Sequence, residues 1–269
     1  MAWNTAYDLD ALMVPTKAAA VYAAQENSLY LPGTMIPHVA VAAGSFTAQV
    51  PVFNKVTAQE LTDAAHNVDD FTALGITAAK KSIDANIFAA RDVIRDLGSV
   101  DPAELGRVLG NSVTAKFDGA VELAMTDTDI TDTITSGGSV TTDDLFDAAA
   151  LIRGNGEMGT LHAILSPAEA AALMKTIGSA AYAGGDLQNN AMANSYVGSV
   201  AGIQVYQSAT QTAQDGCVFS ADAFRIAMFK NVDLEAQRRA AAVGTDIVAS
   251  LHAGVGLVDA TRAVRLLTA

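Results

Sequence analysis

The sequence predicts an α+β protein, in which one long helix and several short ones stand apart from the strands. Three observations support this class. An apolar repeat with helical spacing occupies residues 101–125, short capped helices begin near residues 141 and 166, and strand-like segments fill the last quarter of the chain. The sequence contains neither an internal repeat nor a heptad series.

The first third of the chain is predicted to be an arm followed by a long hairpin. Residues 1–40 form the arm, with a short helix at about 15–25. The segment 39–53 has strand character, because apolar side chains recur at every second position from residue 46 to residue 52. A polar, acidic tract at 57–70 follows, and a return strand covers about 71–84. Two strands joined by such a polar tip predict a hairpin that projects from the body.

Two helices are predicted next, a short one at 87–97 that ends at a glycine and a long one at 101–125. The long helix has the stronger start signal. Asp101 can serve as the N-cap, Pro102 takes the first helical position and Glu104 the third, where the helix dipole favours an acid.

The long helix is predicted to be amphipathic. Its apolar residues recur every four positions: Leu105, Leu109, Val113, Phe117 and Val121. Three glycines, Gly106, Gly110 and Gly119, each cost about 1 kcal/mol relative to alanine. They therefore predict that another element packs close to the helix backbone.

The second half alternates short helices and strands. A Thr/Asp/Gly-rich loop at 126–139 precedes a helix at 141–153 with Gly154 as its C-cap. A strand at 161–165 leads into a helix opened by Ser166 and Pro167, and a polar loop at 183–195 follows. The remaining predicted strands lie at 203–206, 217–219, 226–229, 232–237, 245–258 and 263–266.

Composition and charge exclude several classes of protein. The chain has 269 residues, of which 51% are hydrophobic, and its formal net charge is −13. The apolar content excludes a disordered chain, and the acidic charge argues against nucleic-acid binding. The single cysteine excludes a disulfide framework and favours a reducing compartment. Only 17% of residues are charged, which suggests surfaces that contact other subunits.

A search for chemistry predicts no catalytic, cofactor-binding or metal-binding residue. The run at 154–160 lacks the lysine of a Walker motif, and the isolated Gly254-Val255-Gly256 favours close strand packing or a tight turn over a dinucleotide site. The acidic run at 127–132 starts like a calcium loop but lacks its sixth-position glycine. The four histidines are not at metal spacing. Cys217 is interpreted as a buried packing residue, and His162 and His252 as hydrogen-bonded histidines of the core.

The order of elements resembles the major capsid protein of tailed bacteriophages, the Hong Kong 97 (HK97-like) fold. The hairpin at about 46–84 is similar to that family's extended E-loop, and GITAAKKSIDANIFAARDVIRDL (75–97) to its return strand and short helix. DPAELGRVLGNSVTAKFDGAVELAM (101–125) resembles the spine helix. GTLHAILSPAEAAALMKTI (159–177) resembles the strand, Ser-Pro and helix step of the axial (A) domain. VAGIQVYQSATQTAQDGCVFSADAFRIAM (200–228) is similar to a family stretch in which a Gly-apolar-x-Val segment, a loop and a Gly-x-apolar segment lead into a strand.

The resemblance implies five regions. These are an N-terminal arm (1–40), the E-loop hairpin (41–85), a P-domain with the spine helix (86–142), an A-domain (143–225) and closing strands of both domains (226–269).

The resemblance also implies a structural protein and not an enzyme. The chain would form hexamers and pentamers of the icosahedral head around the dsDNA genome of a tailed phage, in the virion, after assembly in the host cytoplasm. The implied partners are copies of itself, a portal and decoration proteins, and packaged DNA only by non-specific proximity; no membrane is involved. Because only about 40 residues precede the hairpin, a separate scaffolding protein or none is expected.

Two alternatives stay open. One is an encapsulin-like shell of a cellular nanocompartment, which shares the fold, and the other is an enzyme or small-molecule-binding protein with an unrecognised site. Some relatives of this fold join a hairpin lysine to an asparagine of a neighbouring subunit. Here the hairpin lysines are Lys55, Lys80 and Lys81, and the sequence favours ordinary contact residues and a shell without covalent cross-links.

Overall fold

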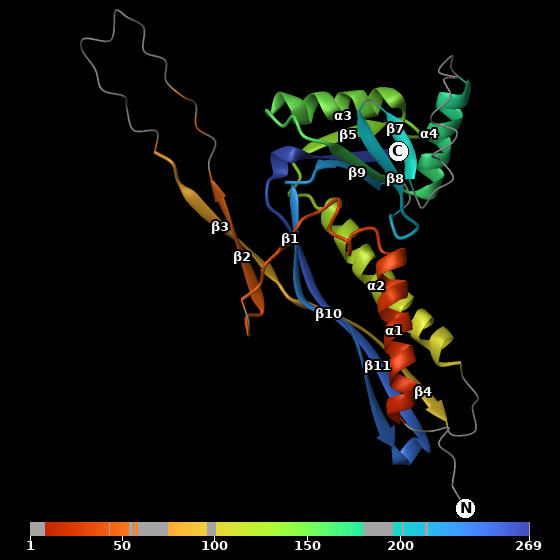
Figure 1. Ribbon diagram of the computed structural model, residues 1–269. Helices are drawn as coiled ribbons and strands as arrows, with labels where there is room; N and C mark the ends of the chain where they lie inside the picture. Colours follow the sequence, from red (N-terminus) through yellow and green to blue (C-terminus); the bar gives the residue numbers. More distant parts are fainter. Residues whose placement is uncertain are drawn as a thin grey trace, which may run out of the picture.

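The computed structural model describes residues 9–42, 44–53, 56, 58, 75–95, 101–179, 196–200, 202–212 and 215–268. It contains two larger sheets, each accompanied by two helices, and a two-stranded hairpin (Figure 1). One sheet extends along the elongated lower part beside α1 and α2, the other lies at the upper end with α3 and α4, and the hairpin projects to one side. This separation of helices and strands confirms the α+β class.

The lower sheet has the strand order β1-β10-β11-β4. The long strands β10 and β11 are antiparallel and joined by the 3-10 turn η2, while β1 pairs parallel with β10 and β4 pairs antiparallel with β11. The bounds are β1 (His38–Val39), β10 (Phe224–Arg239), η2 (Ala240–Ala242), β11 (Gly244–Leu257) and β4 (Asn86–Arg95). The two strands predicted at 226–229 and 232–237 are thus one strand with irregular register between Met228 and Asp233.

The prediction of a short helix at 87–97 is wrong, because the described part of this segment belongs to strand β4. Phe88, Ala90 and Ile94 pack against the core, whereas Arg91 on the other face is exposed, which is the alternation of a strand. The backbone of β4 pairs along its length with β11. This non-local pairing outweighs the helical preference of the alanines and arginines in the segment. The predicted end at Gly98 lies outside the described residues.

Helix α2 (Pro102–Met125) has the predicted bounds and cap. The Asp101 carboxylate accepts a hydrogen bond from the Ala103 N–H at 3.0 Å, and Pro102 is the first helical residue. Glu104, in contrast, does not cap: it forms an ion pair with Arg107 at 2.7 Å. The predicted apolar stripe is buried against the lower sheet and forms one core with it.

Helix α1 (Leu9–Asn27) packs along α2 and begins earlier than the predicted 15–25, with Pro15 inside it. Packing supports the earlier start, since Met13 contacts the core. Within the predicted range, Thr16 is buried beside Gly106 of α2. The close approach predicted from the glycines is therefore confirmed at Gly106 and Gly110. At Gly119 the nearest atom to an added Cβ is 3.9 Å away, an ordinary contact.

The upper sheet has the order β5-β12-β9-β6-β8-β7 and encloses a second core with α3 and α4. Its elements are β5 (Asp132–Ser136), α3 (Thr142–Gly154), β6 (Leu161–Leu165), α4 (Pro167–Ser179), β7 (Tyr196–Val200), β8 (Ile203–Gln207), β9 (Asp215–Ser220), η3 (Ala260–Arg262) and β12 (Ala263–Thr268). The N-terminal caps of the two helices are as predicted: Thr141 and Asp144 form a capping box, and the Glu169 N–H donates to Ser166 Oγ. The predicted C-cap of α3 is wrong, because Gly154 is its last helical residue and Asn155 is the C-cap.

Two strands of this sheet are missing from the sequence-based prediction. β5 lies inside the predicted loop 126–139, where it pairs parallel with β12 and places Ile134 against the upper core. β7 pairs with β8 directly after the predicted loop 183–195, and that loop itself lies outside the described residues. Both strands are at sheet edges, and their polar or small residues carry little periodic signal.

Candidate assembly surfaces

The hairpin is formed by β2 (Thr47–Phe53) and β3 (Ala78–Asp84), in register from Thr47 opposite Asp84 to Phe53 opposite Ala78. This confirms the stem of the predicted hairpin and its projection from the body (Figure 1). The predicted return strand begins later, since residues 75–77 are not in a strand and 71–74 lie outside the described residues. The predicted tip, 57–70, also lies outside them apart from Ala58.

Within the described part of the hairpin, the base is the part that packs on its own subunit. Ala48, Val50 and Ile83 are buried against Ala227 of β10. The hairpin crosses β11 at Gly254 and Gly256, and a Cβ at Gly256 would lie 2.7 Å from the Ile83 side chain. The Gly-Val-Gly motif is therefore a close-packing feature, as the sequence favours.

The outer half of the hairpin has no core of its own. Along β3, Ala78 to Ser82 are all exposed, including Lys80 and Lys81, and on β2 the Phe53 side chain is 64% exposed. A two-stranded ribbon is at best marginally stable in water without a surface to pack on. This half is therefore a candidate surface for contact with another molecule.

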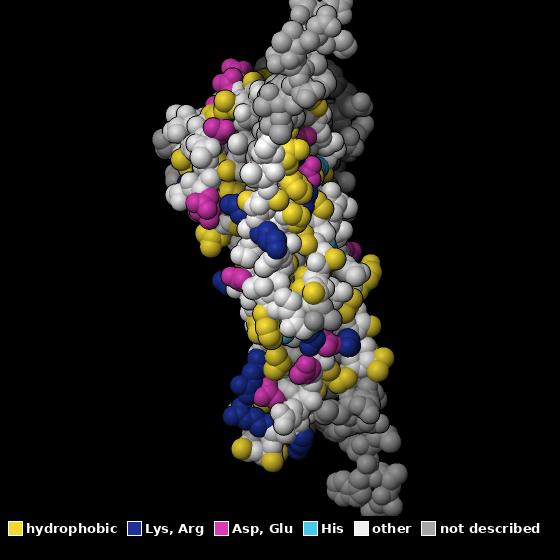
Figure 2. Space-filling view, turned by 90° about the vertical axis from the view of Figure 1, so that its left-hand side faces the viewer, with side chains coloured by type: hydrophobic (Ala, Val, Ile, Leu, Met, Phe, Trp, Pro, Cys, Tyr) yellow, Lys and Arg dark blue, Asp and Glu magenta, His cyan; other side chains and the backbone are white. Residues whose placement is uncertain are grey.

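Further large apolar side chains are exposed on the helices. On α2, Val108 and Leu123 face outward, the latter 72% exposed, and on α3 Phe146 and Leu151 do so. Figure 2 shows hydrophobic side chains distributed along the face on the hairpin side, with Lys and Arg gathered at its lower end. Single exposed apolar side chains are common on soluble proteins, so these four residues are candidate contact positions and not in themselves a sign of assembly.

The residues considered for chemistry do not converge. Cys217 is fully buried on β9, which raises the pKa of its thiol, and His162 is buried on β6 against Phe219 with a pKa lowered by burial. His38 and His252 lie on separate strands of the lower sheet, and His66 lies outside the described residues. The described residues contain no group of three His, Cys, Asp or Glu side chains that could hold a metal ion. None of the described helices has the length and apolar character needed to cross a membrane.

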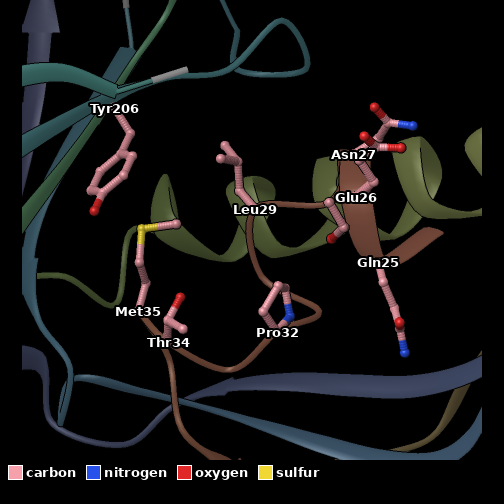
Figure 3. Close-up of a pocket in the computed structure, with 9 residues that line it drawn as sticks. Gln25, Glu26, Asn27, Leu29, Pro32, Thr34, Met35 and Tyr206 are labelled. Atoms are coloured by element: carbon pink, nitrogen blue, oxygen red, sulfur yellow. The ribbon is translucent and has the colours of Figure 1, made fainter. Parts of the chain in front are cut away.

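A hollow of about 380 Å³ lies between the end of α1, the following turn and the upper sheet (Figure 3). Gln25, Glu26 and Asn27 come from α1, and Met35 lies beneath the ring of Tyr206 from β8. Glu26 is the one carboxylate among the lining residues, and it is exposed. The hollow has no set of converging polar groups that would recognise a ligand.

A buried polar cluster beside this hollow joins the segment after α1 to α2. The Ser28 hydroxyl donates to Asp118 Oδ1 at 2.6 Å, and the Leu29 N–H donates to Oδ2 at 3.3 Å. One turn further along α2, the Tyr30 hydroxyl donates to Glu122 Oε1 at 3.2 Å. Sequence reasoning missed both acids, although their place beside Phe117 and Val121 on the apolar stripe was a signal.

Comparison with known proteins identifies the fold. No protein-family model and no curated protein matches the sequence. The structure, in contrast, is similar to the capsid of the cyanophage P-SCSP1u, with a TM-score of 0.67 and 18% identity over 86% of each chain. It is similar to the mature capsid of bacteriophage PhiM1, with a TM-score of 0.61 and 14% identity over 91% of this chain and 86% of that one.

A third similar structure is a virus-like particle from Pyrococcus furiosus. Its TM-score is 0.66 and its identity 10%, over 94% of this chain and 98% of that one. All three similarities span nearly the whole chain at low sequence identity. They confirm the HK97-like fold that the sequence predicts.

Proposed function

We propose that this chain, with its HK97-like capsid fold, is the major capsid subunit of a tailed phage. It assembles as hexamers and pentamers into the icosahedral head that encloses the dsDNA genome. The observation that carries this proposal is the similarity to phage capsid structures over 86% and 91% of the chain.

The surface of the subunit supports self-association. Among the described residues, no part of the chain covers the outer half of the hairpin or the exposed apolar residues of α2 and α3. In a shell they are buried against neighbouring copies, which removes apolar area from water. The hairpin reaches across to a neighbouring subunit.

The charge of the subunit fits a container for DNA. At −13 the chain repels phosphate overall, so a genome can be packed inside the shell without adhering to its wall. DNA is thus a partner by proximity only. Portal, scaffolding and decoration proteins are the other partners of this proposal.

In this assignment five regions have separate roles. Residues 1–40 are the arm, 41–85 the E-loop, 86–142 the P-domain with α2 as its spine, 143–225 the A-domain, and 226–269 the closing strands of both. The separation of the apolar core into one cluster around α2 and another beneath α3 and α4 supports a division into two domains.

Light scattering and electron microscopy of concentrated recombinant protein test the proposal. We expect capsomers or closed shells, alone or with a co-expressed scaffolding protein. A monodisperse species of 27.7 kDa at high concentration under both conditions would contradict it.

The second candidate function is an encapsulin-like shell of a cellular compartment. The similarity to the virus-like particle from Pyrococcus furiosus, over 94% of this chain, favours it. Particles from the native source distinguish the two functions. Packaged dsDNA, and portal and terminase genes nearby, indicate a phage head, whereas an enclosed enzyme and its neighbouring gene indicate a compartment.

A further inference from the structure

Asp118 and Glu122 are two buried acids on one face of α2, four residues apart. Asp118 is only 6% exposed and Glu122 only 2% exposed. Asp118 accepts hydrogen bonds from the Ser28 hydroxyl and the Leu29 N–H, in the segment that follows α1. The same Ser28 oxygen accepts the N–H groups of Tyr30 and Leu31, so one contact with Asp118 organises the whole turn.

Glu122 connects the same face of α2 to the upper sheet. Its Oε1 accepts the Tyr30 hydroxyl, and the hydroxyls of Ser208 and Thr210, directly after β8, face the carboxylate and favour its ionised form. Its other oxygen, Oε2, is buried and has no hydrogen-bond partner of good geometry among the described residues. A buried carboxylate oxygen without a partner is costly when charged and much less so when protonated.

No described lysine, arginine or histidine forms an ion pair with either acid, and each acid is the like-charged neighbour of the other. The other titratable groups that face the cluster are Tyr30 and, from β9, Cys217, and burial raises the pKa of both. Neither supplies a positive charge. Burial consequently raises the pKa of Asp118 to about 7 and raises that of Glu122 above its ordinary value, against the hydrogen bonds that lower both.

We propose that Asp118 and Glu122 form a proton-dependent clasp, which holds the turn after α1 and the β8–β9 loop on α2 when the pair carries a proton and loosens both when the proton is lost. The clasp is a property of the single subunit and does not depend on the proposed function. Because the turn continues the N-terminal helix and the loop belongs to the upper sheet, the proton state sets how firmly both are fixed to α2.

The folded subunit retains a proton that the unfolded chain releases at much lower pH. Stability from this group is therefore greatest at acidic pH and decreases as the pH rises from about 4 to about 7. This sign is opposite to that of Asp222 and Asp233, whose hydrogen bonds to arginine or lysine lower their pKa values. For Asp118 alone, the folding equilibrium constant is roughly 80-fold larger at pH 5 than at pH 8.

Urea unfolding of dilute, unassembled full-length protein between pH 5 and pH 8 tests the clasp. The variant is Asp118→Asn, and the control is Asp147→Asn, which removes an exposed acid of α3. We compare the folding constant of the wild type with that of each variant at every pH. The ratio of wild type to Asp118→Asn should be several tens of times smaller at pH 8 than at pH 5. The ratio of wild type to Asp147→Asn should stay nearly constant over the same range.

A second variant is expected to increase the pH dependence of stability, whereas Asp118→Asn reduces it. Ser28→Ala removes the hydroxyl that favours the ionised form of Asp118, so its folding constant depends more steeply on pH than that of the wild type. Hydrogen exchange of the amides at 28–31 and 208–212, corrected for intrinsic rates, is expected to accelerate above pH 7 in the wild type. Parallel pH profiles of wild type and Asp118→Asn would overturn the proposal. If that variant does not fold, equal pH dependence of wild type and Ser28→Ala overturns it.

Discussion

Gly106 and Gly110 let α1 approach the backbone of α2 more closely than any side chain permits. A Cβ at Gly110 would lie 2.5 Å from the Ala20 carbonyl oxygen, and one at Gly106 would meet the Thr16 carbonyl oxygen. Because these obstacles are backbone atoms, they cannot move aside as a flexible side chain does. Both helices would have to separate.

Gly110→Ala is therefore expected to lower the free energy of unfolding by about 2 kcal/mol, although alanine is the better helix former by about 1 kcal/mol. Gly119→Ala on the same helix is the matched control. Its Cβ would lie 3.9 Å from Thr210 Cβ, so the helix propensity gain remains and stability rises by up to about 1 kcal/mol. Chemical denaturation of both variants measures the difference. Equal effects would show that the helix contact does not decide the cost.

These glycines also show the reach of sequence reasoning at single positions. The sequence indicates that something packs against the three glycines of α2, since each is costly within a helix. It cannot indicate that α1 covers Gly106 and Gly110 but not Gly119. That depends on where the two helices cross, which no local pattern encodes. The buried acids Asp118 and Glu122 are a different case, because their place next to Phe117 and Val121 on the apolar stripe is a local signal that the sequence analysis missed.

Among the elements, α2 was predicted correctly from the sequence and β4 was not. The bounds of α2 are predictable because its cap residues and its apolar period are local signals. The conformation of β4 is not predictable in this way, because it depends on pairing with β11, about 150 residues later in the chain, as the Arg91–Asp246 ion pair illustrates. The stem of the hairpin was predictable from alternation on β2, with the base anchored by Val50.

Substitutions in the outer half of the hairpin are expected to impair assembly without changing the stability of the single subunit. Phe53→Ser removes an exposed side chain from the outer half of β2, so the free energy of unfolding of the subunit should change by less than about 0.5 kcal/mol. Shell formation, followed by light scattering, should be strongly impaired. Val50→Ser on the same strand is the contrasting variant, since it removes a buried side chain and lowers subunit stability itself. If Phe53→Ser forms normal shells, the outer half of the hairpin is not an assembly contact.

For the whole molecule, the fold determines how many surfaces a subunit can offer for assembly. The HK97-like fold gives the chain its long lower sheet, its upper sheet and its projecting hairpin, and in the proposed shell these would present several separate surfaces to neighbours. A shell joined through such surfaces can be stable without covalent bonds, because each subunit contributes more than one contact. The strength of the assembled shell then follows from the number of contacts and not from one chemical link.

We therefore predict a non-covalent shell. A cross-link from a hairpin lysine requires a neutral amine, desolvated beside a base and within reach of the next subunit. Lys80 and Lys81 lie on the stem opposite Pro51 and Val50, both are exposed, and as adjacent strand residues they point to opposite faces. Lys55 lies outside the described residues. Shells boiled in denaturing detergent with reductant should collapse to one band near 27.7 kDa. A ladder from dimers to hexamers that survives this treatment would contradict the prediction, and its loss in a Lys80→Arg or Lys81→Arg variant would identify the residue responsible.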